Sequence, residues 1–362
     1  MMRLTSLAAL LALASSAPMD VRAQIFGGTV MQADSTTPAR GVLMEIRLRS
    51  QPQPMRVLTS ARGTFHLRLA APDTVNVRVL RPGFRPVHAP PVFVGVGATR
   101  DIRIVLEDQP LTLAAVTVRE SRVCGERADA AAWQLWEQAR TALQATALTE
   151  RDSSLTVRTL EFQGPATPGG GTIVQDSTIR FVPVDAEFPR AHYDSLFVHG
   201  YIRRNSDSIT TYYAPNAHVL LDERFVMTHC FRVAERDSTP RGMIGVRFEP
   251  MRSPRVTGIV GTFWLDSTTY LLRQIEFGYL NPPVRHRVLG TGGYVLFERL
   301  GTGHWIMSQW SIRMATFIKD HHLWSRSQMI VTVRLGDQLL FHKPAGDSLA
   351  LRLIPRGDST QP

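Results

Sequence analysis

The sequence has 362 residues, and 44% of them are hydrophobic, which is enough for two domains of about 100 to 200 residues with packed cores. The formal net charge is +10, but the basic residues are scattered singly and lysine occurs only at Lys319 and Lys343. A nucleic-acid site needs clustered cations with stacking aromatic side chains. We therefore expect no nucleic-acid partner, whereas attraction to anionic lipid headgroups needs no specific site.

Residues 1–23 predict a secretory signal peptide. Arg3 precedes the apolar run Leu7–Leu13, and Val21-Arg22-Ala23 forms a small-x-small cleavage site. The alternative, a transmembrane anchor, is disfavoured because this run is shorter than the ~20 residues that a span needs. Gln24 follows the cleavage site, where a lipoprotein would have cysteine. We expect export to the periplasm, with the mature chain free or associated with the outer membrane, or secretion, and no transmembrane helix after residue 23.

Residues 24–118 predict a small antiparallel sandwich, because short alternating runs are separated by turn residues throughout. In the run Val42–Arg49, Leu43 and Glu45 are expected opposite the apolar face. That apolar face consists of Val42, Met44, Ile46 and Leu48. The other expected strands are Ile25–Met31 and residues 57–59, 65–69, 102–106 and 111–118.

Four segments of this region resemble the carboxypeptidase regulatory-like domain, a transthyretin-like sandwich. They are Gly28-Thr-Val30, Thr37-Pro-Ala-Arg-Gly-Val42, Thr59 to Phe65 with its Gly63, and Val77-Arg-Val-Leu-Arg-Pro-Gly-Phe84. The chain departs from the family pattern at Arg40, where a small or apolar residue is usual. Gly63 and Gly83 suit turns that need positive φ. The resemblance implies a non-catalytic accessory module.

We expect a linker over residues 119–127 and one amphipathic helix over Ala128–Leu148. Trp133, Trp136 and Leu143 recur at helical spacing and predict an apolar face, while Glu137 and Gln138 are expected outside it. The two tryptophans could form a ligand shelf, but such residues more often anchor a helix on a sheet.

The second predicted domain covers residues 128–350 and begins with this helix. The rest of the domain is predicted to consist of successive strands, and a polar tail follows over residues 351–362. The clearest unit is the hairpin formed by Thr257–Leu265 and Tyr270–Tyr279. This hairpin is similar to those of periplasmic lipoprotein-carrier half-barrels. The predicted fold is mainly β: a transthyretin-like sandwich, then a larger antiparallel curved sheet or half-barrel packed on one helix. Further strands are expected at Ser195–Arg203, Ala217–Leu221 and Phe225–Thr228.

An outer-membrane-embedded β-barrel is an alternative for these strands, since alternating runs of about ten residues are also its signature. The charges of Arg273 and Arg313 on the candidate lipid-facing sides disfavour it.

An exported chain with two cysteines, Cys124 and Cys230, is expected to pair them. The alternatives are a reactive thiol or a metal ligand beside His229. Adjacent residues on a strand point to opposite faces, so His229 and Cys230 are not expected to share a ligand.

We find no catalytic motif: His-Glu-x-x-His, Gly-x-Ser-x-Gly and Gly-x-x-x-x-Gly-Lys are absent, and no metal or cofactor is expected. His321 and His322 are adjacent and lie near Asp320. We expect these residues to form a surface turn, and the alternative is a pair of metal ligands. A hydrolase with an unfamiliar site remains open around three other histidines, which are His192, His199 and His218.

The favoured interpretation is an exported, non-catalytic protein of the cell envelope. The sandwich would serve docking, and the sheet domain would bind a lipid, glycan or peptide, or an envelope protein. The residues expected to face a ligand are Trp133, Trp136, Trp264 and Tyr279.

Overall fold

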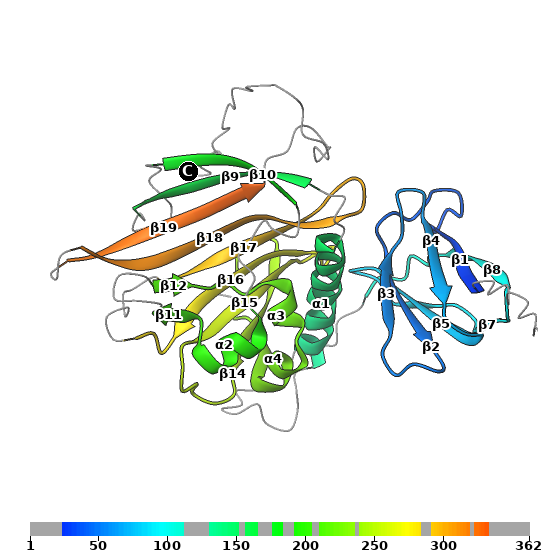
Figure 1. The fold of residues 1–362 in the computed structure, drawn as a ribbon, viewed down its shortest axis with the longest axis horizontal. Helices are drawn as coiled ribbons and strands as arrows, with labels where there is room; N and C mark the ends of the chain where they lie inside the picture. The colour runs from blue at the N-terminus through cyan, green and yellow to red at the C-terminus, as the bar shows by residue number, and fades with distance from the viewer. Residues whose placement is uncertain are drawn as a thin grey trace, which may run out of the picture.

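The computed structural model describes residues 24–111, 130–151, 156–165, 176–183, 192–204, 210–235, 239–283, 291–318 and 322–332. The predicted signal peptide, the linker, Cys124, His321 and the polar tail lie outside these ranges. Figure 1 shows two β-rich bodies, with a long helix on the side of the larger body that faces the smaller one. The chain is mainly β, as the sequence predicts.

The N-terminal body is a sandwich of two sheets. One sheet has the order β4-β1-β8, and the other has the order β3-β2-β5-β6 with β7 also paired to β5. β8 runs parallel to β1, whereas the other pairs in the sandwich are antiparallel. The strands are β1 (Gln24–Met31), β2 (Leu43–Leu48), β3 (Met55–Leu58), β4 (Thr64–Leu69), β5 (Asp73–Leu80), β6 (Val87–His88), β7 (Val92–Val94) and β8 (Thr99–Val105).

The sandwich core follows from two-residue alternation. Val75, Val77 and Val79 of β5 are buried, and the intervening side chains are less so. On the other sheet, the rings of Phe26 on β1 and Phe65 on the neighbouring strand β4 lie 5.6 Å apart in this core. Gly63 and Gly83 have φ of 72° and 82°, which confirms the prediction that these turns need positive φ.

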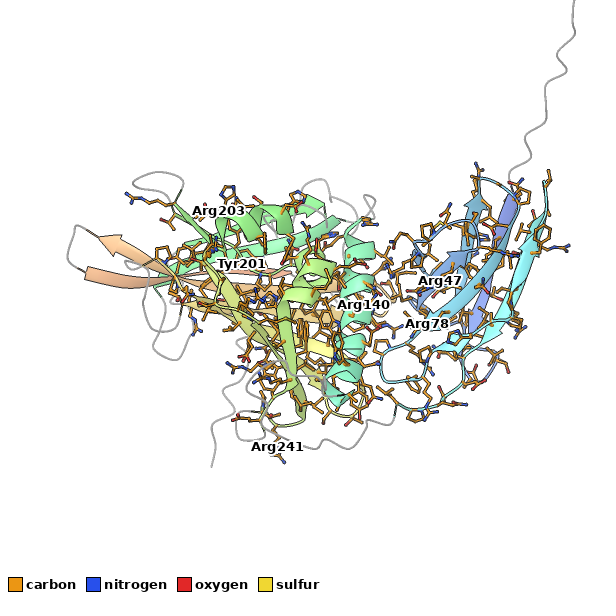
Figure 2. All side chains as sticks on the ribbon, turned by 90° about the horizontal axis from the view of Figure 1, so that it is seen from below. Arg47, Arg78, Arg140, Tyr201, Arg203 and Arg241 are labelled. Carbon is orange, nitrogen blue, oxygen red and sulfur yellow. The ribbon has the colours of Figure 1, made fainter. Side chains whose placement is uncertain are left out.

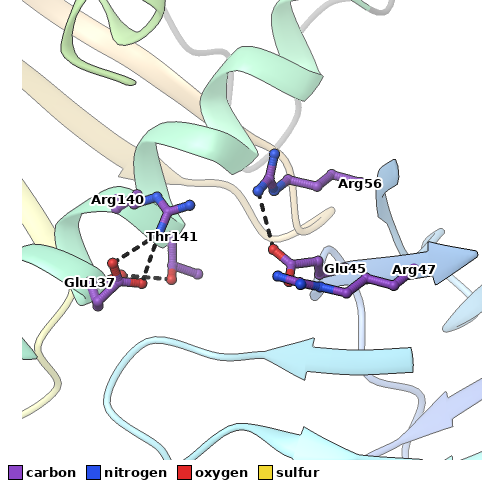
Figure 3. Close-up of polar contacts among 6 residues, drawn as sticks. All are labelled: Glu45, Arg47, Arg56, Glu137, Arg140 and Thr141. Atoms are coloured by element: carbon purple, nitrogen blue, oxygen red, sulfur yellow. Dashed lines mark hydrogen bonds and ion pairs between the residues drawn. The ribbon is translucent and has the colours of Figure 1, made fainter. Parts of the chain in front are cut away.

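Strand β2 is buried on both faces, which the sequence did not predict. Leu43 is 2% exposed and Glu45 is 3% exposed, although both were expected on the outer side. The physical reason is that β2 and β3 contact α1 of the second body, so this sheet has a covered second face. Arg47 and Arg56 lie 3.0 and 3.1 Å from the carboxylate of Glu45 and neutralise it (Figure 3).

The larger body is built on one open antiparallel sheet of nine strands, with the order β10-β9-β19-β18-β17-β16-β15-β14-β13. The predicted hairpin is β15 paired with β16. The nine strands are β9 (Thr156–Pro165), β10 (Asp176–Pro183), β13 (His229–Val233), β14 (Met243–Pro250), β15 (Gly258–Asp266), β16 (Leu272–Leu280), β17 (Gly292–Arg299), β18 (Trp305–Ile318) and β19 (His322–Thr332). A separate two-stranded hairpin consists of β11 (Ile202–Arg204) and β12 (Thr210–Tyr212).

Helix α1 (Ala130–Glu150) packs on one face of this sheet, which we call the inner face. Its Trp136 ring lies 4.8 Å from the ring of Phe231 and 5.1 Å from that of Phe263. The sandwich covers the other side of the helix. As a result Gln138, expected outside, is buried and accepts a hydrogen bond from the Gly83 amide at 2.9 Å.

Three further short helices occupy segments that were predicted as strands. They are α2 (Tyr193–His199), α3 (Ala217–Leu221) and α4 (Glu223–Thr228). The strand assignments at Ala217–Leu221 and Phe225–Thr228 were therefore wrong, and the one at Ser195–Arg203 was wrong up to His199 but right where β11 begins. For α3 and α4 the cause is capping that outweighs β-propensity, whereas the N-cap residue of α2, His192, makes no side-chain capping bond. The Asn216 side chain accepts from the Val219 amide at 2.9 Å, and the Asp222 side chain accepts from the Arg224 amide at 2.9 Å.

Candidate functional site

The space between α1 and the sheet is filled by side chains. Leu135, Ala139 and Leu143 of the helix are fully buried, and Trp136 is 1% exposed. They belong to one continuous core with inner-face residues of the sheet, including Phe248, Phe263 and Ile275. Among the described residues, the helix and the sheet thus pack directly on each other.

The structure does not bring the four predicted ligand-facing residues together. Trp136 lies in the core, and Trp133 is 38% exposed with its ring 5.6 Å from Phe231. Trp264 follows Phe263 on β15 and therefore points to the outer face, where its Nε1 donates to Glu276 at 3.0 Å. Tyr279 lies on the inner face, and its hydroxyl donates to the Tyr213 carbonyl at 3.1 Å.

A cavity of about 210 Å³ lies farther along the inner face, between the β11–β12 hairpin with the segment that follows it and strands β17 and β18. We call it the inner-face cavity. Its sheet side is apolar, and its other side includes three polar residues, Thr210, Thr211 and Asn216. The lining consists of Thr210, Thr211, Tyr212, Tyr213, Ala214, Pro215, Asn216, Val295, Met307, Trp310, Ile312 and Met314.

Strand alternation places the apolar wall of the inner-face cavity. Trp310, Ile312 and Met314 follow one another at intervals of two residues on β18, so they point to the same face. Val295 on the neighbouring strand β17 is paired with Trp310. Two methionines give this wall flexible, polarisable side chains that adapt to irregular apolar groups. For scale, an apolar cavity of about 150 Å³ holds a benzene molecule.

The hairpin wall is held in place by contacts between its own two strands, in addition to the bond from Tyr279 of β16 to the Tyr213 carbonyl. The Tyr213 amide donates to the Tyr201 carbonyl at 2.9 Å, and the guanidinium of Arg203 lies 4.8 Å from the Tyr213 ring centroid. Figure 2 shows Tyr201 inside the body and Arg203 nearer its surface. Burial raises the pKa of the Tyr201 phenol and that of the Tyr279 phenol. Both rings therefore stay neutral at physiological pH.

The outer face carries a polar groove of about 460 Å³. The pairing registers align Arg247, Thr262, Glu276, Tyr294 and Ser311 in one row across β14 to β18. Glycines 261, 278 and 293 and Arg313 also line this groove.

The three histidines proposed for a hydrolase do not converge. His192 and His199 lie at opposite ends of α2, and His218 is on α3, where its Nε2 is 3.2 Å from the buried carboxylate of Glu150. Among the residues that the structure describes, no group of three or more His, Cys, Asp and Glu side chains could hold a metal ion.

His229 and Cys230 are both buried at the start of β13, and alternation puts them on opposite faces. Burial lowers the pKa of His229 to about 4, although a hydrogen bond with the Phe225 carbonyl opposes this effect. The predicted partner of Cys230, Cys124, lies outside the described residues, so the disulfide stays a prediction.

The sequence analysis did not predict the residues of the inner-face cavity, because the ligand-facing residues were expected on the β15–β16 hairpin and on the helix. The period-two signal Trp310, Ile312, Met314 was available in the long strand β18. The pairing of β11 with β12 over this wall was not predicted, since the two strands have three residues each.

Comparison with known proteins assigns no family. No protein-family model and no curated protein matches the chain. One similar solved structure is that of a protein from Bacteroides uniformis ATCC 8492 that is proposed to bind carbohydrate. Its sequence identity is 8% and its TM-score is 0.21, and the match covers 70% of this chain and 94% of that chain. A protein of unknown function from Bacteroides fragilis NCTC 9343, proposed to be membrane-associated, is 11% identical with a TM-score of 0.16, over 86% and 98%. At these TM-scores neither likeness bears on function.

Within the described ranges, no helix combines the length and the apolar character that a membrane span needs.

Proposed function

We propose that this chain is an exported, non-catalytic protein of the cell envelope that binds the apolar part of a lipid in the inner-face cavity. The single observation that carries the proposal is the cavity itself, with its wall of Val295, Met307, Trp310, Ile312 and Met314 on a rigid sheet. Apolar pockets with a few polar groups at one side are the usual form of small-molecule sites. Thr210 and Thr211 are partly exposed and are the groups that would meet the polar end of a lipid.

Export is supported by the order of charged, apolar and small residues over 1–23. The N-terminal body is proposed to be a carboxypeptidase regulatory-like module. Its support is the quoted sequence segments, the two-sheet sandwich and the positive φ of Gly63 and Gly83. In this proposal the sandwich docks the protein and the larger body carries the ligand.

The test is binding of a dansyl-labelled fatty acid to the chain beginning at Gln24, followed by fluorescence. Met314→Glu places a carboxylate in the apolar wall and should weaken binding by about tenfold or more, because an unpaired charge in apolar surroundings is costly. Met251→Glu is the matched control, since Met251 is 49% exposed in a loop away from the cavity.

Circular dichroism and thermal unfolding should show that Met314→Glu and Met251→Glu fold as the wild-type protein does. A second variant, Ala214→Leu, fills cavity volume without adding charge and should also weaken binding. Equal affinity of the wild-type protein, Met314→Glu and Ala214→Leu would exclude the inner-face cavity as the lipid site.

A glycan is the second candidate ligand, and the outer groove is the observation that favours it. Its row of Arg247, Thr262, Glu276, Tyr294 and Ser311 offers charged and hydroxyl groups at regular strand spacing. Screening of envelope oligosaccharides by calorimetry tests this candidate, with Glu276→Gln expected to weaken any true binding. Binding unaffected by that substitution would place a glycan elsewhere.

A further inference from the structure

A further cavity lies between the two bodies, at a place where the sequence predicts no site. This interdomain cavity has a volume of about 400 Å³. The sandwich contributes the segments 41–43 and 80–84 with Gln32 and Pro110. The larger body contributes Thr141 and Ala145 of α1, Thr268, Thr269 and Leu271 of the β15–β16 turn, and Arg299 and Trp305.

Direct contacts fix the two walls relative to each other. Besides the bond from the Gly83 amide to Gln138, the guanidinium of Arg299 donates to the Arg40 carbonyl. Gly41 and Gly303 touch through their backbones, so that a Cβ on Gly41, whose φ is 55°, would lie 2.0 Å from the Gly303 carbonyl oxygen. The cavity is therefore a built feature of the interface, and ligand sites occur preferentially at such interfaces.

Arg81 is held rigidly in the wall of this cavity. Its guanidinium lies 3.5 Å from the ring centroid of Phe84, and Nη2 donates to Asp108 at 2.7 Å and to the Glu107 carbonyl at 2.9 Å. Nη1 donates to the Gln32 side chain at 3.2 Å. Its Nε is buried and has no hydrogen-bond partner. A buried donor without a partner is costly, so this atom indicates an acceptor that belongs to the site.

Arg299 supplies a second positive charge to the same cavity. No carboxylate of the described residues lies within ion-pair distance of it, and its bond to Arg40 leaves other guanidinium donors available. Partial burial beneath the sandwich, together with the positive charge of Arg81, lowers the pKa of this guanidinium. The single carboxylate of Asp108, which is 60% exposed, leaves the pair of arginines with excess positive charge.

We propose that the interdomain cavity binds an oxyanion, a phosphate or a carboxylate, that carries an apolar group. Arg81 and Arg299 hold the oxyanion, since the planar guanidinium matches these anions and forms strong charge-assisted hydrogen bonds. The apolar group lies against Leu43, Phe84, Leu271 and Trp305, which line the same space. The site is separate from the inner-face cavity and does not depend on it.

Calorimetry on the chain beginning at Gln24 tests this proposal with three probes: phenylphosphonate, inorganic phosphate and benzyl alcohol. Phenylphosphonate carries both features and should bind about tenfold tighter than either of the others. Equal affinity for inorganic phosphate would contradict the apolar half of the site, and equal affinity for benzyl alcohol would contradict the anionic half.

Arg299→Gln removes one cation and should weaken phenylphosphonate binding by about tenfold. Arg47→Gln is the matched control, because the side chain of Arg47 is 61% exposed and does not line the cavity. Leu271→Trp fills the apolar half and should reduce phenylphosphonate affinity while leaving inorganic phosphate binding unchanged. Affinity for phenylphosphonate that survives both Arg299→Gln and Leu271→Trp in folded protein would overturn the proposal.

Discussion

His229 shows how burial changes the chemistry of a single side chain in this protein. Its imidazole lies 4.0 Å from the ring of Phe225, and its Nδ1 is 2.9 Å from the Phe225 carbonyl. Burial disfavours the charged form and lowers the pKa to about 4 from an ordinary 6.5. His229 is therefore a neutral core residue at physiological pH.

This lowered pKa predicts a pH-dependent stability. Between pH 6.5 and 4 the unfolded chain binds a proton at this site that the folded chain does not, so acidification favours unfolding. From pH 7 to pH 5 the free energy of unfolding should fall by about 2 kcal/mol through this group. Urea unfolding at the two pH values measures the change, and His229→Gln should remove that part of it. An unchanged pH dependence in His229→Gln would contradict the assignment.

Glu45 illustrates the opposite case at the residue scale. Burial alone would raise its pKa, but hydrogen bonds from Arg47 and the charge of Arg56 outweigh burial and lower it. The sequence indicated only that Glu45 lies opposite an apolar face. Its burial could not be predicted, because it depends on a second body that is far away in sequence.

At the scale of elements, long alternating strands were predictable and short helices were not. β15 and β16 carry nine residues each, enough for a clear period-two pattern and a turn signal. α2, α3 and α4 have seven, five and six residues, too few for helical periodicity to appear. The only local signals for helices in this region were Asn216 and Asp222, which are residue types that favour the N-cap position of a helix.

The cap of α3 can be tested directly. Asn216→Ala removes the acceptor for the Val219 amide and should lower the free energy of unfolding by about 1 kcal/mol. Asn216→Ser retains a capping oxygen and should recover most of that loss. Urea denaturation measures the free energy of unfolding of both variants. Equal stability of Asn216→Ala and the wild-type protein would show that the cap contributes nothing.

The candidate sites were less predictable than the secondary-structure elements, because they form between segments that are far apart in the sequence. The aromatic residues that were singled out, Trp136 and Trp264, are ordered by core packing and by a cross-strand hydrogen bond. The inner-face cavity arises where a small hairpin covers β17 and β18, and the interdomain cavity arises from the docking of two bodies. Both depend on contacts between segments that no local pattern encodes.

At the scale of the whole molecule, α1 joins two separate cores. It belongs to the core of the larger body, and it also contacts β2 and β3 of the sandwich (Figures 1 and 3). Figure 3 places Glu137, Arg140 and Thr141 of this helix opposite Glu45 and Arg56. The two bodies are therefore expected to unfold as coupled units.

The predicted disulfide between Cys124 and Cys230 would add a covalent tie to this arrangement. Closing a loop of this length stabilises a protein by ~4 to 5 kcal/mol in the chain-entropy model. Reduction should lower the denaturation midpoint in urea, and mobility on a non-reducing gel should differ from that of the reduced chain. Titration of two free thiols in the native, unreduced protein would contradict the disulfide.

The central claim is that the inner-face cavity holds the apolar part of a lipid. The most direct measurement is a crystal structure of the chain beginning at Gln24 grown with a fatty acid brominated near its methyl end, using the anomalous signal of bromine. The account predicts a bromine peak between the β11–β12 hairpin and strand β18, beside Trp310 and Met314. A protein saturated with the fatty acid, but with its bromine peak outside this cavity, would contradict the claim.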